Sequence, residues 1–521
     1  MAILGKLIKR GMLLRHKLKQ SDMTLPEAQN MQLFHLLHPA QHTEFGRKWN
    51  FSTLIDHARA SGLPHQELYR LFQENVPVYS YNSMYRDWWC KALDGGVDVC
   101  WPGQVKYFAL SSGTSESASK RIPLTDDMIK ALKKTSINQL TSMTNFPEIP
   151  EQAYTRDWLM LGGSTDLHDR GSYYEGDLSG IAASKLPFWF QKFYKPGRKI
   201  SQIKVWDEKI EEIMAHAHLW DIGFLVGVPA WVQILLEKIR DHYKLTHIHE
   251  LWPNLSVYTY SGVSIEPYRK NLESLMGKPV TFIETYLASE GFMAYHKNPG
   301  RDMELVADGG IFFEFVPFDE ANFDSEGELR PGCQAVMIDQ VQKDVDYAIL
   351  ISTCAGAWRY LIGDTVRFTN PHTGEIIITG RTKHFLSLCG EHLSVDNMNH
   401  AIEKLSTEFQ IDIPEFTVAG LPHGSLFAHH WYLGTDEPAP DGETMAKSLD
   451  RFLCALNDDY AVERGSALRE IRVTTLPVDR FYEWMKRRGK YGGQAKFPRV
   501  LKKNQHQEWL DFLNQNANIL S

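Results

Sequence analysis

The chain has 521 residues, enough for two or three domains with a large core. Its hydrophobic fraction of 43% and charged fraction of 23% are ordinary for a folded globular protein. A formal net charge of −8 provides no basic field, so nucleic-acid binding is not supported. The six cysteines form no C-x-x-C pair, which favours reduced thiols in a cytoplasm over zinc or disulfides. No apolar run reaches the roughly 18–20 residues that cross a bilayer, and no secretory signal is evident.

The first 20 residues carry six Lys or Arg and no acid. Their apolar side chains fall largely on one face of a helix. Such a helix could lie weakly on an anionic membrane surface. An amphipathic terminal helix more often docks its apolar face on its own domain. We therefore expect docking, with membrane-surface contact as the alternative.

Up to about residue 90 the pattern is mainly helical, with breaks at Pro39, 62–64 and Pro77. Beyond it, apolar runs that favour strands alternate with helical periodicity. This alternation predicts an α/β sheet with ligand-binding loops at the strand ends. The strand-like runs are 105–110, 157–163, 224–229, 256–262 and 280–287, and the helical ones include 125–140, 230–243 and 267–276.

From 311 to 379 the pattern is β-rich, and after Gly380 a smaller α+β unit begins. That unit is predicted as helix, two strands, helix, strand and helix. The predicted fold is therefore α/β. A large N-terminal domain with mixed sheets and flanking helices spans 1–380, and a small C-terminal domain spans 381–521.

The stretch ALSSGTSESASKRIP (109–123) places small hydroxylated residues around one glycine and ends in a cation. Exposed N–H groups, hydroxyls and a lysine can together wrap an anion. A flexible surface turn explains the stretch equally well when it is considered alone. The candidate anion-contacting residues are Ser111, Ser112, Gly113, Thr114, Ser115 and Lys120.

Four further stretches follow in order. YLASEG (286–291) ends a predicted strand with Ser289 and Glu290, and YLIGDTVRF (360–368) carries Asp364. GRTKHFLSLCGEHLS (380–394) lies at the predicted boundary, and GGQAKFPRVL (492–501) carries Lys496 in a Gly/Pro-flanked loop. Each stretch by itself could be an ordinary surface feature, but chance explains the occurrence of all of them in this order poorly.

Together with VPVYSYNSMYRDWW (76–89) and YAILISTCAGAWRYLIGDTVRF (347–368), these stretches resemble the Gretchen Hagen 3 family of acyl acid–amido synthetases. The family lies within the adenylate-forming superfamily, which includes acyl-CoA synthetases and luciferase. The resemblance covers nearly the whole chain. It implies a ligase that adenylates a carboxylic acid with ATP and Mg²⁺ and transfers the acyl group to an amine, expected to be an amino acid. It also implies a small C-terminal domain that rotates over the large one.

The resemblance implies three catalytic residues. Lys120 ends the phosphate loop, Glu290 lies near Mg²⁺, and Lys496 swings in to balance charge on the α-phosphate or leaving group. Asp364 is implied to hold the ribose hydroxyls, and Tyr286 to form the adenine-side wall unless it is a core tyrosine. The implied nucleotide contacts are Ser111, Ser112, Gly113, Thr114, Ser115, Ser261, Gly262, Val263, Tyr286, Ser289, Asp364, Arg381 and His392.

Two positions depart from the family pattern. Ser117 stands where the family usually has Gly, and His392 lies roughly where plant members carry a lysine. The acyl pocket is expected from 160–234 and 261–265, including Trp231, although a core tryptophan explains that residue equally well. HIHE (247–250) and AHHW (428–431) lack the H-E-x-x-H spacing and are expected to be structural.

Two alternative functions remain. An acyl-CoA or other thioester ligase would use the same adenylation step, and a non-catalytic nucleotide- or acyl-binding protein could retain the fold. The acyl acid, the amine and the oligomeric state are not predicted.

Overall fold

The computed structural model describes residues 9–14, 23–60, 65–111, 120–186, 190–324, 327–382, 393–423, 426–457, 460–461, 464, 468–492 and 495–517. Several predicted site residues lie outside these ranges. They are Ser112, Gly113, Thr114, Ser115 and His392, together with the departure at Ser117.

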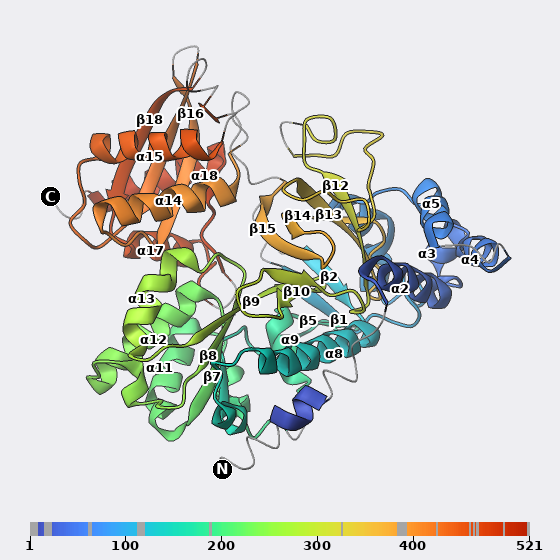
Figure 1. Ribbon diagram of the computed structural model, residues 1–521, viewed down its shortest axis with the longest axis horizontal. Coiled ribbons are helices and arrows are strands. Elements are labelled where there is room, and N and C mark those ends of the chain that lie inside the picture. Colours follow the sequence, from blue (N-terminus) through green and yellow to red (C-terminus); the bar gives the residue numbers. More distant parts are fainter. Residues whose placement is uncertain are drawn as a thin grey trace.

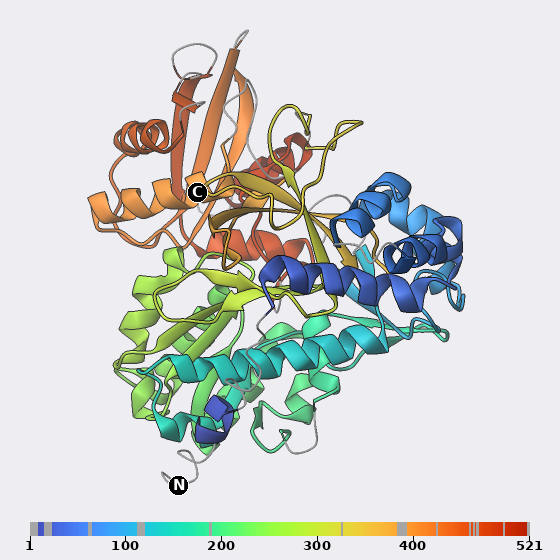
Figure 2. The ribbon, with the colours of Figure 1, turned by 45° about the vertical axis from the view of Figure 1, so that its right-hand side comes forward.

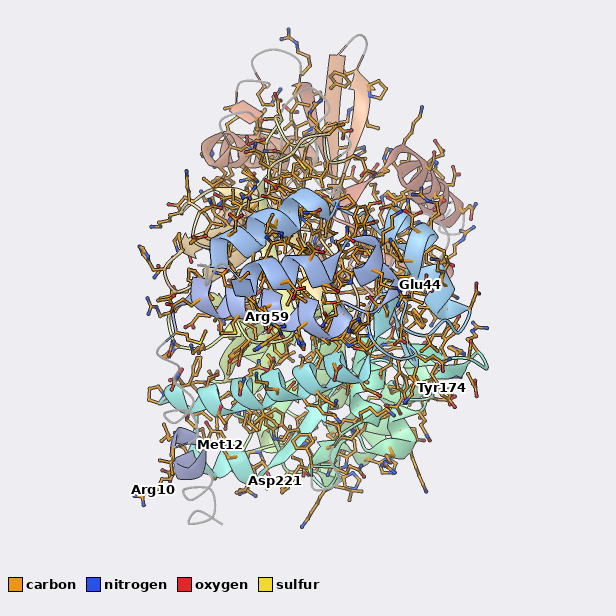
Figure 3. All side chains as sticks on the ribbon, turned by 90° about the vertical axis from the view of Figure 1, so that its right-hand side faces the viewer. Arg10, Met12, Glu44, Arg59, Tyr174 and Asp221 are labelled. Carbon is orange, nitrogen blue, oxygen red and sulfur yellow. The ribbon has the colours of Figure 1, made fainter. Side chains whose placement is uncertain are left out.

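The N-terminal part is helical, as predicted. Helix α2 begins after Thr24, whose side chain forms a capping box with Glu27, and Pro39 lies in its last turn. Helix α2 packs on strands β12 (Ile311–Pro317) and β13 (Asp346–Thr353), and Figure 3 views the molecule from the side of the N-terminal helices. The elements are α2 (Leu25–Ala40), α3 (Glu44–Lys48), α4 (Phe51–Ala60), α5 (His65–Asn75), α6 (Tyr81–Met84), a π-helical turn (Tyr85–Trp89) and α7 (Cys90–Leu93).

An 11-stranded mixed sheet forms the centre of the described residues, in the order β12-β13-β14-β15-β11-β10-β9-β8-β7-β3-β6. From β6 to β9 neighbouring strands are parallel, and the others pair antiparallel. The predicted α/β architecture is confirmed. The remaining strands are β3 (Asp157–Met160), β6 (Tyr194–Lys195), β7 (Ile222–Val226), β8 (Val257–Ser261), β9 (Thr281–Ala288), β10 (Gly291–His296), β11 (Met303–Leu305), β14 (Tyr360–Asn370) and β15 (Glu375–Arg381).

Helices cover this sheet. Figure 1 shows α11 (Trp206–His216), α12 (Pro229–Tyr243) and α13 (Glu266–Met276) grouped beside β7 and β8. Helix α8 (Asp126–Ser142) packs against β10. Shorter helical segments are α9 (Leu178–Ser184), α10 (Arg198–Ser201) and the 3₁₀ turns Met143–Asn145, Glu151–Thr155, Ala217–Leu219 and Ile248–Glu250.

A smaller sheet holds the ends of the predicted anion loop. Strand β1 (Tyr107–Ser111) pairs antiparallel with β2 (Lys120–Leu124), and Ser111 lies directly opposite Lys120. Strands β5 (Tyr174–Gly176) and β4 (His168–Asp169) complete this sheet. The pairing brings the two ends of the loop together, as a loop that encloses a ligand requires.

The C-terminal region has its own sheet, in the order β18-β17-β16-β19. The predicted series of helix, two strands, helix, strand and helix is confirmed, while β19 and α18 were not predicted. The elements are α14 (Val395–Phe409), β16 (Glu415–His423), β17 (Leu426–Gly434), α15 (Gly442–Leu456), β18 (Leu468–Leu476), α17 (Asp479–Arg487), β19 (Val500–Leu501) and α18 (Lys503–Ala517).

One apolar cluster joins this region to the large part. It includes Trp231 and Leu235 of α12 together with Phe481, Phe497 and Trp509. Figure 2 shows the C-terminal region, orange to red, above the green helices of the large part. The division of the chain at 380/381 stays a prediction.

The described part of the first 20 residues is a short helix at 9–14. Lys9 Nζ donates to the carbonyl oxygen of Ile149 at 3.1 Å, and Met12 packs against a cluster that includes Tyr154. Figure 3 labels Arg10 and Met12 on this helix at the lower edge of the molecule. For these residues the expected docking is confirmed, and membrane-surface contact stays a prediction. Across the described ranges, no helix combines the length and apolarity needed to cross a membrane.

Candidate active site

Asp364 is the centre of a buried hydrogen-bonded group. The register of β14 and β15 places Asp364 opposite Arg381, and Arg381 Nε donates to Asp364 Oδ1 at 2.6 Å. From β9, the Tyr286 hydroxyl donates to Asp364 Oδ2 at 2.6 Å. Three residues that lie far apart in the sequence therefore meet at one carboxylate.

Opposing effects set the charge of Asp364. Burial raises its pKa, but the positive charge of Arg381 and the hydrogen bonds from Tyr286 and Arg381 outweigh burial. The net pKa is lowered, so Asp364 is an ionised acceptor at neutral pH. The same carboxylate raises the pKa of Arg381 and holds it as a cation.

Glu290 lies just beyond the end of β9 and is 8% exposed. The hydroxyl of the fully buried Tyr360 donates to Glu290 Oε1 at 3.3 Å. Burial and the negative charge of Asp364 raise the pKa of Glu290, and the charges of Lys120 and Arg381 partly oppose this. Glu290 therefore lies within electrostatic range of Asp364, Lys120 and Arg381. Tyr360 carries no signal in the sequence that distinguishes it from a core tyrosine.

Lys120 begins β2 and lies against Tyr81 of α6. Its Nζ is 5.2 Å from the centroid of the Tyr81 ring, and the Tyr81 hydroxyl accepts the backbone N–H of Arg121 at 2.9 Å. A cation over an aromatic face is favourable by about 0.5–2 kcal/mol, depending on exposure. The segment 76–89, quoted above only for its resemblance, thus supports the lysine at the end of the anion loop.

Lys496 reaches the site from the C-terminal region, in the loop before β19. A Cβ atom added to Gly262 would lie 2.8 Å from Lys496 Cε and 3.0 Å from Nζ, so the lysine head lies directly on this glycine. The Lys496 side chain is exposed to solvent, although many protein atoms surround and partly desolvate it. This desolvation and the nearby charge of Arg381 lower its pKa to about 8, against the opposing effect of Asp364.

Most described site residues therefore converge. Ser261 ends β8, and Gly262 and Val263 follow it, with Val263 lining a small cavity beside Lys496. Ser289 directly precedes Glu290. Tyr286 is only 5% exposed and its hydroxyl bonds Asp364, so its role as a wall for the adenine stays a prediction.

Trp231 lies where the large part meets the C-terminal region. Its indole N–H donates to the carbonyl oxygen of Ala495 at 2.9 Å, and its ring is 4.9 Å from that of Tyr491. It is 1% exposed. The structure thus places Trp231 next to the Lys496 loop, and its contribution to an acyl pocket stays a prediction.

The two histidine-rich stretches hold structural histidines. The His249 ring bonds the carbonyl oxygens of Met276 and Leu255, and the His430 ring bonds Thr474 Oγ1 and the Tyr432 hydroxyl. Among the described residues, no three His, Cys, Asp or Glu side chains cluster to hold a metal ion. The structural interpretation of both stretches is supported.

Family comparison agrees with this geometry. The GH3 family N-terminal domain matches residues 14–166 and 133–281, the GH3 family central domain 304–376, and the GH3 family C-terminal domain 396–505. The chain belongs to the GH3 family.

Named GH3 relatives match parts of the chain. It is 29% identical to jasmonoyl–L-amino acid synthetase JAR4 of Nicotiana attenuata over 190 residues. This match covers 34% of this chain and 32% of that protein. It is 24% identical to the probable indole-3-acetic acid-amido synthetase GH3.9 of Oryza sativa subsp. japonica over 231 residues. This match covers 41% of this chain and 50% of that protein. The matched stretch spans about a third of the length of the first of these relatives.

Solved structures share the fold of this GH3 chain. A GH3.15 acyl acid amido synthetase superimposes with a TM-score of 0.74 at 16% identity, covering 94% of this chain and 93% of the other. A 2-hydroxyisobutyryl-CoA ligase in the postadenylation state superimposes with a TM-score of 0.59 at 13% identity, covering 94% and 92%. An acyl acid amido synthetase and a CoA ligase therefore share this architecture.

Proposed function

We propose that this GH3 chain is an ATP-dependent acyl acid–amido synthetase. In the first step a carboxylate oxygen of the acid attacks the α-phosphorus of ATP, and pyrophosphate leaves. In the second step an amine attacks the carbonyl carbon of the acyl adenylate, the amide forms, and AMP and a proton leave. The observation that carries the proposal is the position of Lys496 on Gly262, within electrostatic range of Asp364 and Arg381.

Asp364 is proposed to hold the ribose. An ionised carboxylate is an acceptor with about four lone-pair sites. Tyr286 and Arg381 each use one oxygen, so capacity remains for the two ribose hydroxyls. The lowered pKa of Asp364 supports this role, because an acceptor must stay ionised in a buried site.

Lys120, Arg381 and Lys496 are proposed to offset the charge of the phosphates and the attacking acid. Two anions must meet in the first step, and fixed cations in a partly desolvated site stabilise the charge that develops. The ends of the anion loop, Ser111 and Lys120, are paired opposite each other. The roles of Ser112 to Ser115 and of His392 stay predictions, since these residues lie outside the described ranges.

Glu290 fits a Mg²⁺ ion together with phosphate oxygens. Mg²⁺ prefers oxygen ligands and is commonly bound through one or two carboxylates plus substrate phosphates. The raised pKa of Glu290 means that an added cation would favour its ionised form. Bound there, the ion would neutralise phosphate charge. We also propose a cytoplasmic location, which the free state of the five described cysteines supports.

The test is ATP–pyrophosphate exchange with pooled aryl, indole-type, short-chain and fatty acids, each with Mg²⁺. We expect exchange that depends on one acid class, followed by amide formation when amino acids are added to that acid. Lys496→Ala should slow exchange far more than it weakens ATP binding.

Two outcomes would change the assignment. Thioester formation with CoA and no product with amino acids would identify a thioester ligase that shares the adenylation step. A folded chain that binds ATP but shows no exchange with any pool would be a binding protein.

A further inference from the structure

Among the described residues, two hydrogen bonds tie the loop that carries Lys496 to the large part, one directly and one through Glu415. At one end the Trp231 indole N–H donates to the Ala495 carbonyl oxygen at 2.9 Å. At the other end the tie runs through Glu415, whose Oε1 accepts the Tyr268 hydroxyl at 2.7 Å. Both donors come from helices of the large part, α12 and α13.

Glu415 is joined rigidly to the Lys496 loop. Arg499, three residues after Lys496, donates from one guanidinium nitrogen to Glu415 Oε2 at 2.8 Å and to the Phe416 carbonyl oxygen at 3.1 Å. The side chains of Arg499 and Glu415 are 11% and 4% exposed. Thr417 Oγ1 donates to the Pro498 carbonyl oxygen at 2.7 Å. A displacement of Glu415 is therefore transmitted to Lys496.

Tyr268 lies on α13, the helix that follows the turn at Gly262, and its side chain is buried at 1% exposure. A small cavity of about 10 Å³ lies between the two parts beside Lys496. Trp231, Tyr268, Glu415 and Arg499 are among the residues that line it. That space holds about one water molecule. The contact is thus closely packed when Lys496 lies on Gly262.

We propose that Tyr268 is a positioning residue for the adenylation step, holding Lys496 at Gly262 through Glu415 and Arg499. The inference rests on the proposed function. Apolar contacts between the two parts are non-directional and tolerate sliding, whereas a hydrogen bond to a buried carboxylate holds only in one arrangement. The Tyr268 hydroxyl therefore selects the arrangement that brings Lys496 to the nucleotide site.

The test is Tyr268→Phe in the full chain, which keeps the ring and removes only the hydroxyl. We expect the maximal rate of ATP–pyrophosphate exchange to fall about tenfold, with little change in the KM for ATP, because a hydrogen bond to a charged group is lost. Amide formation from synthetic acyl adenylate and amine should keep the wild-type rate. Competitive acetylation should show the pKa of Lys496 moving up toward its ordinary value as its surroundings loosen.

Tyr482→Phe is the matched control. Its hydroxyl lies 3.5 Å from the same Glu415 oxygen, but both residues belong to the C-terminal region, so exchange should change less than about twofold. Trp231→Phe should act like Tyr268→Phe, because it removes the other tie to the loop. If one of the two substitutions impairs folding, the other variant still tests the proposal.

Wild-type exchange in folded Tyr268→Phe, or an equal loss in both half-reactions, would overturn the positioning role. A wild-type chain without any exchange would instead overturn the proposed function.

Discussion

Burial raises the pKa of a carboxyl group and lowers that of an ammonium group. At Asp364 the neighbouring Arg381 and Tyr286 reverse the effect of burial, so the carboxyl stays ionised. At Lys496 the largest charge effect again comes from Arg381, and it adds to desolvation rather than opposing it. One arginine thus stabilises the charge of the first group and destabilises that of the second.

This difference predicts an alkaline limit for adenylation. The pKa of Lys496 is lowered to about 8, so the ligand-free enzyme loses this positive charge as pH rises through that value. We expect kcat/KM for ATP in the exchange assay to fall above about pH 8, because this parameter reports the free enzyme. Lys496→Arg, which stays protonated, should move the limit upward. An unchanged limit in that variant would assign it to another group.

The same shift affects folding. Between the lowered pKa and the ordinary value of 10.5, the unfolded chain holds the Lys496 proton and the folded chain has released it. The contribution of this group to stability therefore increases as pH rises through that window.

Removing the Asp364 carboxylate should chiefly weaken nucleotide binding. We expect Asp364→Ala to raise the Kd for ATP at least tenfold, since hydrogen bonds to a charged acceptor contribute about 1.5–3 kcal/mol each. Isothermal titration calorimetry measures this directly. Asp346→Ala is the control, because Asp346 pairs with Arg367 elsewhere on the same sheet. Normal ATP affinity in Asp364→Ala would remove the ribose assignment.

At the scale of elements, strand register and one turn create the site. The antiparallel register of β14 and β15 places Asp364 opposite Arg381, and the turn after β8 presents Gly262 to Lys496. Gly262 has φ +95°, a backbone conformation that side-chain-bearing residues rarely adopt. The turn therefore requires glycine for its conformation as well as for the space that Lys496 takes.

Gly262→Ala should lower the exchange rate through Lys496. The added methyl group would meet Lys496 Cε and Nζ and displace them. Gly300→Ala is the control, since Gly300 has φ +66° but open space around its Cβ position. Both variants should lose about 1–3 kcal/mol of stability from backbone strain, as denaturant unfolding measures.

Only Gly262→Ala should slow exchange, and it should have no further effect when Lys496 is already alanine. An equal loss of exchange in Gly300→Ala, or additive losses with Lys496→Ala, would contradict the steric explanation.

At the scale of the whole molecule, one apolar cluster crosses between the large part and the C-terminal region. Phe481 of α17 is fully buried in it, with Phe497 at 4.8 Å and Trp509 at 5.3 Å between ring centroids. Phe497 directly follows Lys496 in the chain. The packing that joins the two parts therefore also supports the loop of the proposed catalytic lysine.

Phe481→Ala should destabilise the chain by about 3–5 kcal/mol, because it leaves a cavity in this shared core. The midpoint of denaturant unfolding should fall, and exchange should be lost at a lower denaturant concentration than in wild type. Leu219→Ala is the control, since Leu219 is 65% exposed and should change stability by less than about 0.5 kcal/mol. An unchanged midpoint for Phe481→Ala would mean that the cluster relaxes around the missing ring.

Local pattern predicted most of the elements. Runs such as 280–287 and 395–409 carry a clear strand or helix period, and they appear as β9 and α14. Strands of two or three residues, such as β6, β11 and β19, were not predicted because so few residues show no period. The quoted motifs and their family resemblance predicted Asp364, Arg381 and Lys496 as site residues, and the structure brings them together.

The partners of those residues depend on tertiary structure. Three tyrosines contact charged residues that lie far away in the sequence. The pairs are Tyr360 with Glu290, Tyr81 with Lys120 and Tyr268 with Glu415, and their members are 70, 39 and 147 positions apart. Composition and period describe a residue's own neighbourhood, and for these tyrosines they indicate only a buried aromatic ring. Which carboxylate or ammonium each ring meets is decided by strand register and by how the C-terminal region packs on α12 and α13. The fold class and the candidate site residues could thus be predicted from local sequence and resemblance, whereas the hydrogen bonds that set their charges required the folded chain.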